Sequence, residues 1–190
     1  MKYVIATHNP GKLAELQRIL APLGIDAVTV DGLTDADETG TTFAENAYIK
    51  AELACRETGL PAVADDSGLC IDALGGEPGV RTARYAPVGQ RKATVLQKLG
   101  DLPREKRTAR FVSAVCCVWP DGRVVTAEGV CEGFIGTTCR GDGGFGYDPI
   151  FEIEDGRTFA ELSAEDKDAI SHRGVALRLF KQKLQQELEK

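Results

Sequence analysis

The sequence predicts an α/β fold, and three segments of the chain indicate it. Residues 3–7 are predicted to form a short apolar strand, which a polar loop and a helix start follow. Residues 60–64 form a second short apolar run that ends in small polar residues. Residues 108–119 and 123–131 flank the turn sequence 120–122, and we expect them to form a β-hairpin. Strands that alternate with helical segments are typical of α/β proteins.

The bulk composition is that of a globular protein. The 190 residues fall within the size of one domain, and we expect a single domain over residues 1–190. Hydrophobic residues make up 43% and charged ones 27%, which allows a sizeable core. The net charge of -6 argues against a general nucleic-acid binder, because such a protein needs a basic face to release phosphate counterions. Any polyanion site must therefore be a local cationic pocket.

The chain carries no membrane or secretion signal that we can identify. Apolar runs such as 112–119 are too short to cross a bilayer, and the start lacks the long apolar stretch and cleavage site of a secretory signal. The six cysteines show no CxxC pair and no histidine spacing suited to zinc. We therefore expect no membrane partner, a cytoplasmic location and reduced, mostly buried thiols at Cys55, Cys70, Cys116, Cys117, Cys131 and Cys139.

The first helix begins with a cation in its opening turn. Asn9 is a good N-cap and Pro10 a good first helical residue, so we expect a helix that runs to about Leu20. Lys12 then opposes the helix dipole, unless an anion docks on the free N–H groups. The segment is no Walker A sequence, since it lacks the first glycine and the final Ser/Thr. It is a weak phosphate signal by itself.

The second helix begins near Thr42, and Glu45 has two possible roles there. Thr42 and Glu45 match a capping box, in which the glutamate folds back onto the Thr42 amide. Lys50 interrupts the apolar helical face that should pack on the sheet. A lysine so placed needs a buried anionic partner, and either a protein carboxylate or a bound phosphate meets that need. The rest of this face consists of Phe43, Ala47, Ala51 and Ala54.

Two adjacent carboxylates, Asp65 and Asp66, follow the predicted strand 60–64. We expect them at the end of the strand, facing a crevice, which is where α/β proteins bind ligands. Mg²⁺ typically takes one or two carboxylates while substrate phosphates and waters fill its other positions. The alternative is a solvated Asx turn without a ligand.

The C-terminal third repeats the arrangement of cations at a helix start. Ser163 opens a short helix, and Ser171 can cap the last helix, which carries His172 and Arg173 in its first turn. The apolar stripe of that helix comprises Val175, Leu179 and Leu184. The two cations either bind a ligand or pair within the protein.

Residues 141–149 form a glycine-rich loop that holds two aromatics and a carboxylate. This composition suits a planar base that stacks over Phe145 or Tyr147, although such a loop can also be a plain surface loop. Arg81 and Arg84 follow the glycine-rich turn 75–79, and they reach a cleft or are solvated.

Taken together, the motifs resemble those of the inosine triphosphate pyrophosphatase family. The likeness covers almost the whole chain, and several separated motifs in one order make a chance match very unlikely. The motifs are 6–12 (ATHNPGK), 42–47 (TFAENA), 64–69 (ADDSGL), 74–80 (LGGEPGV), 83–85 (ARY), 144–151 (GFGYDPIF) and 171–173 (SHR).

The resemblance implies an α/β fold with a long, curved mixed β-sheet, flanking helices and two lobes around a central cleft. It also implies a homodimer and an enzyme, a nucleoside triphosphate pyrophosphatase. The implied reaction is the Mg²⁺-dependent hydrolysis of ITP, dITP and XTP to the nucleoside monophosphate and pyrophosphate. The only implied partner besides the second subunit is the purine nucleoside triphosphate.

The resemblance also implies roles for individual residues. Asp66 is the implied general base and a magnesium ligand, Glu45 helps to hold the metal, and Asp65 lies beside them. The implied substrate-binding residues are Thr7, His8, Asn9, Pro10, Gly11, Lys12, Lys50, Ser67, Phe145, Gly146, Tyr147, Asp148, Lys167, His172 and Arg173. His8 stands in a variable slot where small residues are common, and Arg81 stands where the family pattern leads us to expect an uncharged side chain.

Two other functions compete with this interpretation. One is a pyrophosphatase for modified pyrimidine triphosphates, and the other is a nucleotide sensor that binds without hydrolysis. The carboxylates argue against a sensor, because extra negative charge beside a triphosphate makes sense chiefly with a metal. Selectivity for hypoxanthine or xanthine over adenine has a candidate in Arg173 or Lys167, which can donate to a 6-oxo group but not to an amine.

Overall fold

The structure is a computed structural model that describes residues 1–190 and divides into two compact units. The first unit comprises Met1–Asp66, Ser113–Gly129 and Val175–Lys190, and the second comprises Ser67–Val112 and Val130–Gly174. The expectation of a single domain over the whole chain stays a prediction. None of the helices combines the length and the apolar character that a membrane span requires.

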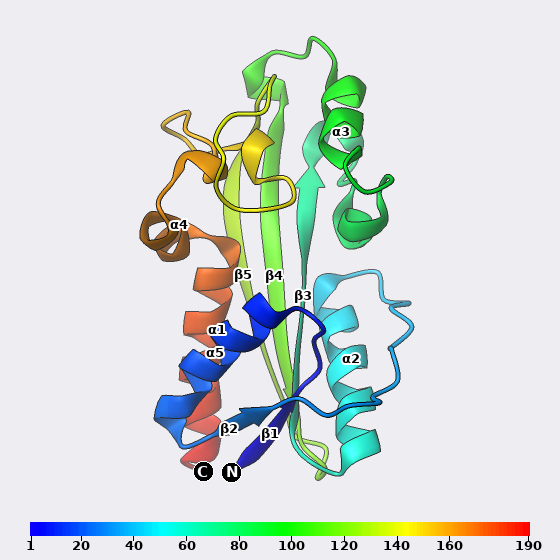
Figure 1. The fold of residues 1–190 in the computed structure, drawn as a ribbon, viewed down its shortest axis with the longest axis vertical. Helices are drawn as coiled ribbons and strands as arrows, with labels where there is room; N and C mark the ends of the chain where they lie inside the picture. Colours follow the sequence, from blue (N-terminus) through cyan, green and yellow to red (C-terminus); the bar gives the residue numbers. More distant parts are fainter. The chain divides into compact units, whose positions relative to one another are not determined.

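The strands form one mixed sheet of six strands in the order β2-β1-β3-β4-β5-β6 (Figure 1). Strand β1 pairs in parallel with β2 and with β3, whereas β6 runs antiparallel to β5. The predicted α/β class with a mixed sheet and flanking helices is therefore confirmed. The strands are β1 (Lys2–Ile5), β2 (Asp26–Val28), β3 (Ala62–Ile71), β4 (Thr108–Val118), β5 (Val124–Ile135) and β6 (Phe151–Glu152).

Five α-helices accompany the sheet, and four of them start at the capping residues that the sequence predicts, whereas α3 starts without a side-chain cap and was not predicted. The Asn9 side chain accepts hydrogen bonds from the N–H groups of Gly11 and Lys12, and the Ser163 side chain accepts one from Asp166. The Gly174 N–H donates to Ser171 Oγ at 3.1 Å. The helices are α1 (Pro10–Leu20), α2 (Phe43–Thr58), α3 (Arg91–Leu99), α4 (Ala164–Ile170) and α5 (His172–Leu188).

In the first unit, helices cover both faces of the sheet. Helices α1 and α5 lie together on one face, where Leu16, Leu20 and Phe180 join a core with Tyr3 and Val63 (Figure 1). Helix α2 lies on the other face (Figure 1). Each of these core side chains is at most 1% exposed, so the first unit has a well-buried core on the α1–α5 side.

Helix α2 buries the face that its sequence predicts. Phe43, Ala47, Ala51 and Ala54 are all less than 9% exposed, which confirms the predicted stripe. The helix ends at Gly59, whose φ of 68° is left-handed and therefore favours glycine. A residue with a Cβ would be strained in that backbone conformation.

The second unit has its own aromatic core. Phe111, Phe151 and Phe159 are packed with ring centroids 4.6 to 5.7 Å apart. Arg107 is 1% exposed, and its guanidinium donates to carbonyl oxygens, among them those of Ile135 and Gly136 at 2.7 Å. A buried cation without such acceptors would be costly, so these carbonyls explain why arginine is tolerated there.

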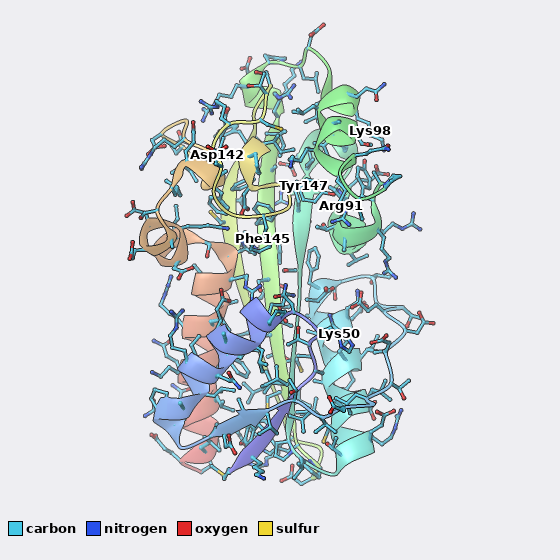
Figure 2. All side chains as sticks on the ribbon, in the orientation of Figure 1. Lys50, Arg91, Lys98, Asp142, Phe145 and Tyr147 are labelled. Carbon is cyan, nitrogen blue, oxygen red and sulfur yellow. The ribbon has the colours of Figure 1, made fainter.

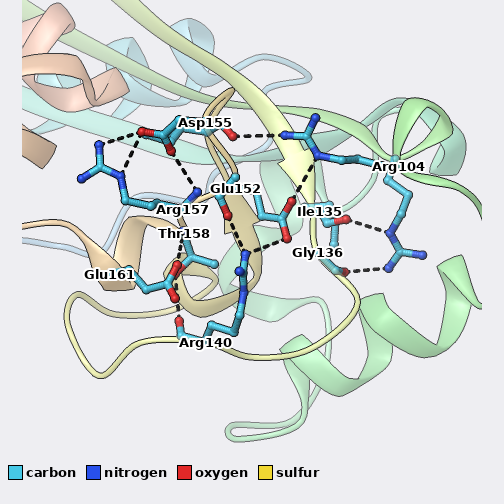
Figure 3. Close-up of polar contacts among 12 residues, drawn as sticks. Arg104, Ile135, Gly136, Arg140, Glu152, Asp155, Arg157, Thr158 and Glu161 are labelled. Carbon is cyan, nitrogen blue, oxygen red and sulfur yellow. Dashed lines mark hydrogen bonds and ion pairs between the residues drawn. The ribbon is translucent and has the colours of Figure 1, made fainter.

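A polar network at the surface of the second unit fixes the short strand β6. Glu152 accepts from Arg140 at 2.9 Å and from Arg104 at 3.4 Å, and Figure 3 shows its carboxylate between the two guanidinium groups. Asp155 pairs with Arg157 in the adjoining turn at 2.7 Å. The arginines are substantially exposed, so solvent screens these ion pairs and each contributes little to stability.

The predicted hairpin is confirmed. The Trp119 N–H donates to the Arg123 carbonyl at 3.0 Å and closes the turn between β4 and β5. Strand β5 continues to Ile135, beyond the predicted end at residue 131. The indole of Trp119 donates to the Tyr3 hydroxyl at 3.0 Å within the first unit.

The end of the third strand was predicted wrongly. Asp65 and Asp66 do not lie in an exit turn, because β3 continues through them to Ile71. Leu69 and Ile71 are fully buried in the core of the second unit, so burial favours an extended chain beyond the carboxylates. Because Asp65 and Asp66 lie within a strand, they do not form the solvated Asx turn that was the alternative interpretation.

Candidate active site

Five charged side chains of the first unit form a compact group, which we call the acid–lysine cluster: Lys12, Glu38, Lys50, Asp65 and Asp66. Lys12 Nζ lies 2.7 Å from Asp65 Oδ2. Lys50, which projects from α2 in Figure 2, has its Nζ 2.9 Å from Glu38 Oε1 and 3.5 Å from Asp66 Oδ1. The buried partner that Lys50 required is therefore a pair of protein carboxylates.

The short length of β1 places the carboxylates of β3 in this group. The pairing of β1 with β3 ends at Ile5↔Val63, two residues before Asp65. Beyond that point the chain leaves β1 for the loop that precedes α1, whose first turn carries Lys12. The cluster therefore forms at the carboxyl end of β1, in accordance with the general rule for ligand sites in α/β proteins.

Burial and charge act in opposite directions on these groups. Burial raises the pKa of Asp66, the Lys50 ammonium lowers it, and the Glu38 carboxylate raises it again, with a net rise. Burial lowers the pKa of Lys50, but the carboxylates of Asp66 and Glu38 outweigh burial, and the net pKa is raised. Three carboxylates face two ammonium groups, so the cluster favours the addition of positive charge.

The residues present fit a magnesium ion that completes its coordination with substrate. No group of three or more His, Cys, Asp and Glu side chains is arranged to hold a metal in residues 1–190. The Asp66 Oδ2 atom is nevertheless buried and lacks a hydrogen-bond partner. A buried carboxylate oxygen without a partner is costly, and a hard cation satisfies it. Mg²⁺ needs only one or two protein carboxylates when phosphates and waters supply the rest.

Glu45 forms the capping box that the sequence offered as one of its two roles. Its Oε2 atom accepts from the Thr41 N–H at 2.6 Å, the Thr41 hydroxyl at 2.9 Å and the Thr42 N–H at 3.1 Å. These hydrogen bonds, led by that of the Thr41 backbone, lower the pKa of the exposed Glu45 carboxyl. None of the hydrogen bonds described uses Oε1. The metal-binding role of Glu45 stays a prediction.

The predicted phosphate loop surrounds the start of α1 in the first unit. The Asn9 N–H donates to Thr7 Oγ1 at 3.2 Å, and Asn9 then caps the helix that Pro10 and Gly11 begin. His8 is 83% exposed in its side chain, and its Nε2 lies 2.6 Å from Asp35 Oδ1. The loop is therefore ordered by its own hydrogen bonds, and the Asn9 side chain occupies the N–H groups of Gly11 and Lys12 at the start of α1.

In the second unit, a buried ion pair organises the glycine-rich loop. Asp148 is 3% exposed, and its Oδ2 accepts from Lys167 Nζ at 2.6 Å and from the Phe145 N–H at 2.8 Å. A Cβ at Gly144 would lie 2.0 Å from that oxygen, so only glycine fits there. The loop thus presents Phe145, which is 66% exposed, with the Lys167 ammonium 4.8 Å from its ring centroid.

The two aromatics of this loop have different environments (Figure 2). Tyr147 is 3% exposed, and its hydroxyl donates to the Thr82 carbonyl at 2.9 Å. Burial raises the pKa of Tyr147 to about 12. Phe145 is therefore the ring that a base can stack on, whereas Tyr147 anchors the loop, with Gly146 between them.

The remaining predicted residues also belong to the second unit. His172 is 7% exposed, and its ring is stacked on Phe111 with centroids 4.7 Å apart, so the core holds it. Arg173 follows it in the first turn of α5 and is half-buried. Ser67 is a half-buried residue of β3.

The structure thus collects the predicted residues into two groups, one in each unit. The first unit holds the phosphate loop, Glu45, Lys50 and Asp66, and the second holds Ser67, the glycine-rich loop, Lys167 and the start of α5.

Two residues of the first unit that contact the site were not predicted from the sequence. Glu38 contacts Lys50, although it lies in the acidic loop 35–38 that the sequence gives no reason to single out. Asn46 is fully buried in α2. One signal could have found Asn46, since it lies four residues before Lys50 on the apolar face of α2.

A family model described as the Ham1 family matches residues 3–183. The chain belongs to the Ham1 family. Curated relatives of this Ham1 chain are named dITP/XTP pyrophosphatase. The relative from Symbiobacterium thermophilum is 49% identical and matches over 93% of this chain and 91% of its own length. A relative from Thermus thermophilus is 50% identical over 94% of this chain and 89% of its own.

Solved Ham1 structures share the fold. The Ham1 protein of Staphylococcus aureus aligns with a TM-score of 0.91 and 37% identity over 98% of this chain and 100% of its own. The dITP/XTP pyrophosphatase of Mycobacterium abscessus aligns with a TM-score of 0.82 and 46% identity over 94% of this chain and 98% of its own. The resemblance that the sequence motifs carried is confirmed at the level of the family.

Proposed function

We propose that the protein hydrolyses the non-canonical purine nucleoside triphosphates ITP, dITP and XTP to the nucleoside monophosphate and pyrophosphate, with Mg²⁺ as cofactor. The observation that carries this proposal is the acid–lysine cluster, in which carboxylates outnumber ammonium groups. Such a group suits a triphosphate only together with a metal. A nucleoside triphosphate pyrophosphatase is also the enzyme class named for the curated relatives.

Asp66 is the proposed general base and metal ligand. Its Oδ1 faces Lys50, while its buried Oδ2 lacks a hydrogen-bond partner and can hold either a cation or the attacking water. Mg²⁺, when bound, would polarise the phosphate oxygens and offset the charge of the leaving pyrophosphate. Glu38 is the carboxylate best placed to assist Asp66, because it shares Lys50 with it.

The phosphate-binding residues of the first unit are Thr7, His8, Asn9, Pro10, Gly11, Lys12 and Lys50 in this proposal. Lys12 and Lys50 would exchange part of their contact with protein carboxylates for phosphate oxygens. This exchange places positive charge where negative charge develops on the leaving group, and one preorganised contact of this type contributes about 3 to 4 kcal/mol.

The base and sugar would be held by the residues of the second unit. The exposed ring of Phe145 offers a stacking surface, and Asp148 and Tyr147 fix the loop that carries it. Ser67, Gly146, Lys167, His172 and Arg173 complete the proposed set. That both groups serve one nucleotide rests on the family resemblance.

Selectivity for a 6-oxo purine is proposed to come from cationic donors. Lys167 uses one of its three N–H donors on Asp148 and lies beside Phe145, and Arg173 is in the first turn of α5. Adenine would place an amine against these donors and leave a buried polar group unpaired, which discriminates by up to about 10⁴.

We also propose a homodimer in the cytoplasm. The six cysteines are all free, as expected for a reducing compartment. The homodimer rests on the family resemblance, and its mass in solution would be measured by light scattering after gel filtration.

The test is a substrate panel with the purified protein. ITP, dITP, XTP, GTP, ATP and dUTP are incubated with Mg²⁺ or with EDTA, and pyrophosphate and orthophosphate are measured separately. We expect pyrophosphate from ITP, dITP and XTP only, no orthophosphate, and loss of activity in EDTA.

The other outcomes identify the competing functions. Turnover of dUTP in place of ITP indicates a pyrimidine triphosphate pyrophosphatase. Binding of ITP without turnover indicates a sensor. Release of orthophosphate from the γ-position contradicts the proposed reaction, because the attacked bond is then a different one.

A further inference from the structure

Asn46 is a fully buried polar residue that none of the proposed roles uses. It lies in the first turns of α2, one residue after Glu45 and four before Lys50. Its side chain is 0% exposed. A buried amide without hydrogen bonds is costly, so both ends of this group require an explanation.

One end of the amide holds the loop that carries Glu38. Asn46 Oδ1 accepts from the Gly40 N–H at 2.8 Å. Gly40 is two residues from Glu38, whose carboxylate lies 2.9 Å from Lys50. The hydrogen bond therefore restrains the segment that brings Glu38 into the acid–lysine cluster.

The approach of this loop to Asn46 leaves no space for a side chain at Gly40. A Cβ built there would lie 2.6 Å from Asn46 Oδ1 and 2.7 Å from the Glu45 Cβ. Such contacts are far shorter than van der Waals distance, so any larger residue has to push the loop away from the helix.

The other end of the amide faces the proposed catalytic carboxylate. The Asn46 side chain lies close enough to the Asp66 carboxyl to oppose the rise in its pKa that burial causes. Its Nδ2 nevertheless lacks a partner with hydrogen-bond geometry, and the same is true of Asp66 Oδ2. Two buried polar groups that are close together and only partly satisfied indicate an arrangement kept for a ligand.

We propose that Asn46 is a positioning residue that holds the Glu38 loop and the Asp66 carboxylate in a fixed relation, so that the two carboxylates can share a divalent cation. This inference rests on the metal dependence in the proposed function. It adds a residue that touches neither substrate nor metal.

The test measures the binding of Mn²⁺ alone to the free protein, through the spectroscopic signal of unbound Mn²⁺. The variants are Asn46→Ala, which removes both ends of the amide, and Gly40→Ala, which displaces the loop but keeps the amide. Ala54→Gly is the matched control, because it weakens the same helix about two turns away from Asn46 and one turn beyond Lys50. We expect Mn²⁺ affinity to fall at least about fivefold in the first two variants and less than about twofold in the control.

A double-variant cycle separates positioning from plain stability. If Asn46 acts through Glu38, Asn46→Ala should lose less Mn²⁺ affinity in a Glu38→Gln background than in the wild type. A lower thermal unfolding midpoint with unchanged Mn²⁺ affinity would show a structural role only and overturn the proposal. Additive effects of the two substitutions would overturn it as well.

The outcome does not depend on the identity of the nucleotide. If the wild type binds Mn²⁺ but hydrolyses no triphosphate, the proposed function fails while the role of Asn46 is still measured. If the wild type binds no Mn²⁺, the proposal for Asn46 fails. At saturating Mg²⁺, Asn46→Ala should lower kcat for ITP more than it raises KM, since it disturbs the carboxylates and not the base-binding loop.

Discussion

The acid–lysine cluster of the first unit and the glycine-rich loop of the second differ in their balance of charge. In the cluster, Asp66 and Glu38 share one lysine, and carboxylate charge remains in excess. In the loop, Asp148 and Lys167 neutralise each other and leave an aromatic ring exposed. The excess of carboxylates in the cluster favours the binding of a cation that can take part in catalysis. The neutral Asp148–Lys167 pair instead stabilises the conformation of the glycine-rich loop. Substitutions in the first region should therefore act on kcat and those in the second on KM.

Asp66→Asn is the substitution with the largest expected effect, and it tests the role of the acid–lysine cluster. The substitution removes the proposed base and metal ligand with little change of volume, so we expect kcat for ITP to fall on the order of a hundredfold or more. Release of pyrophosphate is the measurement. Asp26→Asn, at an exposed carboxylate of the same unit, is the control and should stay within about twofold. An Asp66→Asn enzyme with undiminished turnover excludes the proposed role.

The carboxylate that assists Asp66 can be identified with two charge-neutral substitutions. Glu38→Gln should raise the Mg²⁺ concentration for half-maximal rate by about tenfold, because Glu38 shares Lys50 with Asp66. Glu45→Gln keeps a capping box, which accepts Gln as well as Glu, so it tests the metal role of Glu45 alone. A larger effect of Glu45→Gln than of Glu38→Gln would favour Glu45 as the ligand.

Phe145→Ala tests whether the exposed ring of the second unit binds the base. Stacking of one base on an aromatic ring contributes about 1 to 3 kcal/mol, so we expect KM for ITP to rise about tenfold while kcat changes less. Phe145→Tyr retains the ring and should retain KM. A fall in kcat with constant KM would contradict the division between the two regions.

The smallest expected effect is that of Tyr147→Phe. The substitution removes only the hydrogen bond to the Thr82 carbonyl, which contributes about 1 kcal/mol to the free energy of unfolding. For a protein of this size the thermal midpoint should fall by about 2 to 4 °C. Activity should stay within about threefold of the wild type. A large rise of KM would instead make Tyr147 a substrate contact.

Local sequence signals predicted the starts of α1, α2 and α4 correctly because they act over a few residues. Asn9, Thr42 and Ser163 each accept hydrogen bonds from the helix that follows them. The position of Lys50 on an apolar helical face also led to a correct prediction, namely a buried anionic partner. It required a buried anion, although it left the identity of that anion open between protein and phosphate.

Non-local effects account for the errors and the omissions. The end of β3 was misplaced because Leu69 and Ile71 are buried by the core of the second unit, which a local apolar pattern cannot show. Glu38 escaped notice because its role depends on a loop that approaches Lys50 in space. Asn46 escaped because a buried amide is recognised only when its burial is known.

Residue type and order along the chain were enough to predict the α/β class, the family and most of the residues proposed for the chemistry. The folded structure was needed to show which carboxylates contact Lys50, which aromatic ring is exposed and which oxygen of Glu45 accepts the capping hydrogen bonds. Those properties depend on distances between segments far apart in sequence, and burial and charge pairing fix such distances only when the chain is folded.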